Sequence, residues 1–180
     1  MSDVRNSRSH YGYVGTEHNF RADFSGSLRA GARYIDFYND PASESGVSPY
    51  VQASLRYIYT TESFARVGFG YDRNPTSQFS AQGNSITLDA QSLVAFASIS
   101  HRIVPNLYGS VTGQFQNSTF NGGSLDNETE NYYVVDLNLE YRFNPHLSAE
   151  VGYNYDQVDS DVSGGGFTRN RVYLGVTASY

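Results

Sequence analysis

The chain has 180 residues, a formal net charge of −6, 15% aromatic and 17% charged residues, and no Cys. Without Cys, a disulfide scaffold and a thiolate metal site are excluded. The acidic balance also disfavours nucleic-acid binding, because phosphates are neutralised by a positive surface. No stretch supplies the ~20 consecutive apolar residues of a spanning helix. The high content of aromatic residues also disfavours an intrinsically disordered chain.

About nine segments alternate apolar and polar residues with the period of two that indicates β-strands. The first covers residues 10–20, and later ones include 24–34, 51–59, 64–74, 107–117, 132–143, 147–156 and 171–180. In the segment 132–143, Val135, Leu137 and Leu139 share one face, whereas Asp136 and Glu140 share the other. Each segment is therefore expected to have one apolar and one polar face.

The connections between these segments alternate between short and long. Short ones lie near residues 21–23, 61–63, 104–106 and 144–146, and long polar ones cover 39–48, 73–85, 117–130 and 159–169. Similar sequence follows each short turn, so a hairpin of about 40 residues repeats along the chain. No linker or break in composition interrupts the series. We therefore expect a single domain over 1–180, with residues 1–9 as a candidate flexible tail.

The fold predicted from this pattern is all-β, an antiparallel transmembrane β-barrel of about eight to ten strands. Leu, Val, Ala and Gly occupy the middle of the apolar faces and Tyr and Phe their ends, as in strands that cross a bilayer between two aromatic girdles. Short turns on one side and long loops on the other match the periplasmic and extracellular ends of such barrels. The residues predicted to face lipid are Val135, Leu137, Leu139, Val151, Leu174 and Val176.

The last strand, RVYLGVTASY (171–180), and YRFNPHLSAEVGYNYD (141–156) carry a family resemblance. The chain resembles the outer-membrane β-barrel proteins of Gram-negative bacteria, and in particular the C-terminal portion of the β-barrel porin type 2 group, whose members are usually longer. The resemblance implies that Tyr180 is a signal for the barrel-assembly machinery. It also implies an outer-membrane location, with the lipid bilayer and lipopolysaccharide as surroundings. The sequence MSDVRNSRSH (1–10) has no apolar signal region, so we expect the mature or a trimmed form.

If the apolar face meets lipid, the polar face lines the lumen. Basic residues fall on three early strands and most acidic ones on two later strands, an arrangement that would orient polar solutes at a constriction. A passive channel for small hydrophilic solutes is therefore one hypothesis. The other is a structural or surface-interaction barrel whose lumen is packed with ion pairs. The predicted lumen residues are Glu17, Arg29, Arg33, Arg56, Arg66, Asp136, Glu140, Glu150 and Asp156.

Three questions remain open in the sequence. The first and ninth segments run in the same direction, so the chain forms an even-stranded barrel without its first segment, closes in parallel, or is completed by another barrel segment or a second copy. An outer-membrane hydrolase is the least favoured function, because His10, His18, His101 and His146 have no evident catalytic partner and the G-x-S-x-G elbow is absent. Asp156, Asp159 and Asp161 resemble a solvated acidic loop more than a cation site. We expect neither a cofactor nor a metal.

Overall fold

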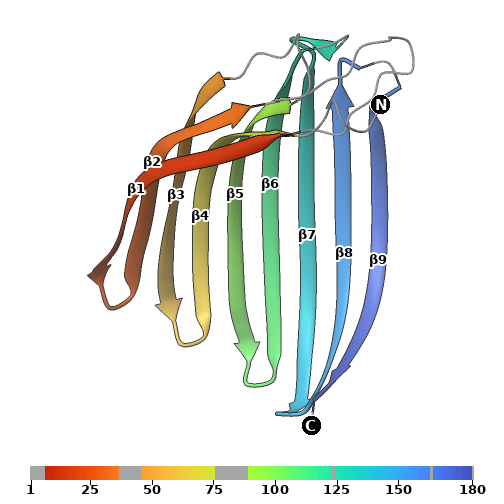
Figure 1. Cartoon of the computed structure of the whole chain (residues 1–180). Helices are drawn as coiled ribbons and strands as arrows, with labels where there is room; N and C mark the ends of the chain where they lie inside the picture. Colours follow the sequence, from red (N-terminus) through yellow and green to blue (C-terminus); the bar gives the residue numbers. More distant parts are fainter. Residues whose placement is uncertain (1–6, 37–45, 76–88, 123–124, 163, 180) are drawn as a thin grey trace.

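The computed structural model describes residues 7–36, 46–75, 89–122, 125–162 and 164–179. These residues form one antiparallel sheet in which nine strands follow one another in chain order. Figure 1 shows them side by side in a curved sheet with tight hairpins at one end. The strands are β1 (Arg8–Arg21), β2 (Phe24–Asp36), β3 (Gly46–Thr60), β4 (Ser63–Pro75), β5 (Asp89–Val104), β6 (Leu107–Asn121), β7 (Thr129–Asn144), β8 (Leu147–Ser160) and β9 (Phe167–Ala178).

The hairpin repeat predicted from the sequence is confirmed by this topology. Two-residue gaps separate β1 from β2, β3 from β4, β5 from β6 and β7 from β8, at the four predicted short turns. Each of these hairpins has one register irregularity directly before its turn, at 19–21, 58–60, 102–104 and 142–144. Between these irregularities and the long-loop ends of the strands the pairing is regular, so alternate residues lie on opposite faces of the sheet. Arg8 and Ser9, which the sequence assigned to a candidate tail, lie in β1.

Within the part of the chain that the structure describes, no helix is long and apolar enough to span a membrane.

One face of the sheet, here called the apolar face, carries exposed aliphatic side chains across all nine strands. Leu174 on β9 is the extreme case, with 83% of its surface exposed. Tyr59 and Phe143 lie at the short-turn ends of this face, and Tyr34 and Tyr133 lie towards the other ends. The six aliphatic residues predicted to face lipid all lie exposed on this face: Val135, Leu137, Leu139, Val151, Leu174 and Val176.

Little of the described chain is buried in the manner of a soluble core. A small cluster of Ala90, Phe120 and Leu125, with Val162 against it, lies at the long-loop end of β5 and β6. The backbone of Phe120 closes this cluster by accepting from Asn127 N and donating to Glu128 O, both at 3.0 Å. The cluster therefore ties one long connection to the sheet, and the stability of the rest depends on strand pairing.

The outer strands β1 and β9 are not paired with each other in the described residues. Both run from the long-loop end to the short-turn end, since Arg21 precedes the first short turn and Ala178 pairs with Leu147 directly after the last one. The nine strands of the described residues fall within the predicted range of eight to ten. Tyr180, the predicted assembly signal, lies outside the described residues.

Candidate functional site

A continuous row of polar residues crosses the sheet on the face opposite the apolar one, here called the polar face. Each member is the direct partner of the next, so all nine side chains share one face. The row begins on β1 and ends on β9, and its charged members are Arg56, Arg66, Asp136 and Arg171. In strand order it reads Asn19, Ser25, Arg56, Arg66, Ser98, Thr112, Asp136, Asn154 and Arg171.

The structure places all the predicted lumen residues on this polar face, in two groups. The basic residues and Glu17 lie on β1 to β4, and the acidic residues lie on β7 and β8. The basic group consists of Arg29, Arg33, Arg56 and Arg66, and the acidic group of Asp136, Glu140, Glu150 and Asp156.

Arg29 and Arg33 each contact a carboxylate, but in different surroundings. Arg29 forms an exposed ion pair with Glu17, 3.2 Å from Nη2 to Oε1. Arg33 is buried at the long-loop end, where its guanidinium lies 3.3 Å from Asp72 Oδ2, donates to Ser9 Oγ at 3.1 Å and lies 4.6 Å from the ring centre of Tyr11. Arg33 therefore connects β1, β2 and β4 through its side-chain contacts, whereas the side chain of Arg29 remains accessible to solvent.

Arg56 and Arg66 lie directly opposite each other on β3 and β4. Both are exposed, and each guanidinium lies over a phenylalanine, Arg56 at 4.3 Å from the ring centre of Phe64 and Arg66 at 5.3 Å from that of Phe96. Two like charges in direct cross-strand contact destabilise a sheet. Such a pair is therefore unexpected as a purely structural element.

A pair of opposite sign occupies the equivalent place in another hairpin. Glu140 on β7 is the direct partner of Glu150 on β8. Arg56 and Glu140 lie four residues before the ends of their strands, and Arg66 and Glu150 lie three residues after the starts of theirs. The two pairs are therefore at the same distance from the short turns, with positive charge on one side of the sheet and negative charge on the other.

The acidic pair is neutralised more than the basic pair. Arg142 donates to Glu140 through Nε and Nη2 at 3.0 and 3.1 Å, and Asn138 donates to Glu150 at 2.9 Å. The Asn138 amide also donates to the hydroxyl of Tyr173 at 3.1 Å. Both carboxylates are consequently held in place by neighbouring side chains.

Asp156 is a buried carboxylate on the polar face that pairs with two arginines. Its side chain is 1% exposed and accepts from Arg169 at 2.7 Å and Arg171 at 3.1 Å, and Tyr132 donates to it at 3.4 Å. The expected solvated acidic loop is wrong for this residue, because Asp156 lies within β8 and not in the following connection. Asp161, the residue directly after β8, accepts from the Thr129 hydroxyl. Among the described residues, no group of three potential ligands is placed to hold a metal ion.

Two sets of residues in these networks were missed by sequence reasoning. Arg169 and Arg171 could have been found, because they alternate against Val172 and Leu174 in the last strand. Arg73, Asp89 and Asn121 could not, because they lie beyond the apolar band on the apolar face. There Arg73 holds Asp89 through two bonds of 2.8 and 2.7 Å, and Asn121 donates to the same carboxylate at 2.7 Å.

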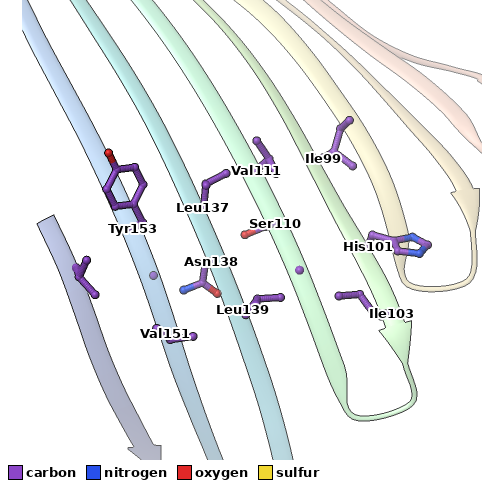
Figure 2. A pocket seen from close by; sticks show the side chains of 13 residues that line it. Ile99, His101, Ile103, Ser110, Val111, Leu137, Asn138, Leu139, Val151 and Tyr153 are labelled. Carbon is purple, nitrogen blue, oxygen red and sulfur yellow. The ribbon is translucent and has the colours of Figure 1, made fainter. Parts of the chain in front are cut away.

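The apolar face has a shallow hollow of about 480 Å³ near the short turns of β5 to β8. Figure 2 shows Ile99, Val111 and Leu137 lining it, with Val151 on β8. At its edge His101 stacks on Tyr59, with ring centres 5.8 Å apart and Nδ1 3.1 Å from the Tyr59 hydroxyl. His101 thus contacts both the ring and the hydroxyl of Tyr59 at the short-turn end of the apolar face.

A family model described as Putative beta-barrel porin 2 matches residues 1–180 of the chain. A search of curated proteins found no match to the chain.

Proposed function

This chain belongs to the beta-barrel porin 2 family, and on that basis we propose that it forms the wall of a passive channel for small hydrophilic solutes in a bacterial outer membrane. The polar face lines the aqueous path and the apolar face contacts lipid. In this proposal the width of the path excludes large solutes, and the charges of the wall attract or repel small ones. Transport of this kind uses neither a cofactor nor catalysis.

The separation of side chains between the two faces supports this proposal. Charged residues are costly in hydrocarbon, and the charged residues of the middle of the strands lie on the face opposite Leu174 and Val176. The exposed aliphatic residues, with aromatic rings towards both ends, suit a lipid environment. A water-filled path is then the natural surrounding for the row of polar residues that crosses all nine strands.

The observation that carries the channel hypothesis is the space beside the basic residues. Two hollows of about 540 and 460 Å³ lie on the polar face, and both are lined by Glu17, Ser27, Ser54 and Arg66. Arg29 and Glu17 have 44% and 74% of their side chains exposed. A channel wall needs accessible charged groups beside open space, and for that reason we propose the channel ahead of the packed structural barrel.

The surroundings follow from the proposed location. The apolar face would contact the lipid bilayer, and the long-loop end would lie next to lipopolysaccharide. Tyr180 would be read by the barrel-assembly machinery during insertion. A second copy or a further barrel segment would pair with β1 and β9, since edge strands cannot remain unpaired in lipid.

Electrical recording tests the proposal directly. Purified protein, folded in detergent and added to a planar bilayer, is expected to produce stepwise, voltage-independent conductance in KCl. Vesicles that contain the protein are expected to admit small sugars and amino acids and to exclude large dextrans. Heat-denatured protein is the control. A folded protein that inserts into the bilayer and conducts no ions would contradict the channel and favour the packed barrel.

A further inference from the structure

We propose that Arg56 and Arg66 form a binding site for an oxyanion, the carboxylate or phosphate group of a small solute, on the polar face. The inference rests on the proposed function, because it names the class of solute that the channel would take up.

Among the described residues, no carboxylate lies within ion-pair distance of either guanidinium. Glu17 lines the same hollow, but it pairs with Arg29 at 3.2 Å. Arg56 and Arg66 are nevertheless direct partners across β3 and β4. An arrangement that costs stability and lies in an exposed hollow points to a ligand that supplies the missing negative charge.

The aromatic contacts orient the two guanidinium groups for such a ligand. The guanidinium carbon of Arg56 lies over the ring of Phe64, and that of Arg66 lies over the ring of Phe96. A guanidinium that is stacked on a ring still has its N–H groups free in the plane, and these groups match the paired oxygens of a carboxylate or phosphate. Stacking therefore fixes the side chains without occupying the donors that an oxyanion uses.

The surrounding residues leave room for the ligand. The hollow of about 460 Å³ beside the pair is lined by Ser25, Ser27, Ser54 and the two arginines, among others. Gly68 follows Arg66 on the same face, and a Cβ there would lie 2.7 Å from Phe96 Cε1. The absence of a side chain at Gly68 thus lets Phe96 reach the place where it supports Arg66.

The first experiment measures binding, with the whole folded protein in detergent. Inorganic phosphate and acetate are titrated separately by calorimetry, and sodium chloride is the comparison. Wild-type protein is expected to bind at least one of the two oxyanions saturably, and the double variant R56Q/R66Q about tenfold or more weakly. R21Q is the control for loss of an arginine outside the hollow: it removes one positive charge at the first short turn, where Arg21 pairs with Asp23 at 3.3 Å. The phosphate and acetate arms separate the two oxyanion classes.

A charge-preserving variant separates a site from a diffuse positive field. R56K/R66K keeps both charges and loses the planar, stacked donors. If the site is as proposed, this variant loses most of the preference for the oxyanion over chloride but keeps the anion preference in bilayer recordings. Equal binding of chloride and both oxyanions by the wild type, or wild-type oxyanion affinity in R56K/R66K, would overturn the site.

Bilayer recording distinguishes failure of the site from failure of the channel. In a KCl gradient, R56Q/R66Q is expected to shift the reversal potential towards cation preference, with the permeability ratio changed about twofold or more. Protein that conducts but shows no saturable oxyanion binding keeps the channel and refutes the site. Protein that binds phosphate or acetate at these arginines without conducting keeps the site and refutes the channel. Heat-modified migration on gels checks that every variant is folded.

Discussion

Tyr173 on β9 covers Gly152, its direct partner on β8, so closely that any Cβ on Gly152 would overlap the tyrosine ring. The hydroxyl of the same tyrosine accepts from Asn138 on β7. One ring from the edge strand therefore reaches across two strands of the polar face. This close approach requires a glycine, which explains why Gly152 lies between Glu150 and Asn154 on the polar side of β8.

Replacing Gly152 by alanine is expected to destabilise the folded protein by about 1–3 kcal/mol, because the ring must move out of its place. Urea unfolding in detergent, followed by tyrosine fluorescence, measures the loss. Gly113→Ala is the matched control, since nothing lies within 4 Å of a Cβ built at Gly113. That control is expected to change stability by no more than about 0.5 kcal/mol. Equal effects of the two substitutions would contradict the role of the ring.

Arg73 and Asp89 are expected to respond unequally to mutation. The Asp89 side chain is 2% exposed and that of Arg73 15% exposed, so Arg73→Gln leaves a buried carboxylate with Asn121 as its remaining described donor. This change is expected to cost about 3–5 kcal/mol. Asp89→Asn is expected to cost less, because the freed arginine can turn towards water. Thermal unfolding of both variants measures the two losses of stability. A larger loss in Asp89→Asn than in Arg73→Gln would contradict this prediction.

An arginine on the apolar face is expected to be far more damaging than one on the polar face. Leu174→Arg places a charge on the lipid side of β9, and charges near the bilayer midplane cost about 2–4 kcal/mol in such barrels. Thr112→Arg, on the polar face of β6, is the comparison and is expected to fold normally. Folding yield into vesicles measures both. Protein that refolds as a water-soluble monomer without detergent would refute the membrane assignment of the apolar face.

The acidic pair is expected to act in the opposite sense to the basic one. Replacing Glu140 and Glu150 by glutamines removes two negative charges from the proposed channel wall, so the reversal potential in a KCl gradient should move towards anion preference. The size of the effect should be smaller than that of R56Q/R66Q, because Arg142 already neutralises Glu140. A shift towards cation preference would mean that these side chains do not face the conducting path.

The strands and their faces were predictable because both depend on a local period of two. Leu137 and Leu139 alternate with Asp136 and Glu140 in the sequence, and the short turns fix the register of each hairpin. The same rule predicts that Arg169 and Arg171 lie on the polar side of the last strand, opposite Val172 and Leu174.

Pairing between distant hairpins was not predictable in the same way. Nothing local indicates that Arg33 on β2 meets Asp72 on β4, because this contact depends on the relative shift of strands that belong to different hairpins. The long connections 39–48 and 73–85 leave that shift undetermined by length alone. Burial of Asp156 likewise follows from its two arginine partners on the next strand and not from its own surroundings in sequence.

The shared direction of β1 and β9 limits how this sheet can become part of a ring. A ring built only from copies of the nine-stranded sheet would contain a parallel seam at each junction, where β9 of one copy meets β1 of the next. A ring in which every neighbour is antiparallel needs an odd number of further strands between these two edges, which makes the total even, as in bacterial single-chain barrels. Cross-linking of cysteines introduced in β1 and β9 would therefore report the seam: a direct disulfide means parallel closure, and its absence in folded protein means that intervening strands separate the edges.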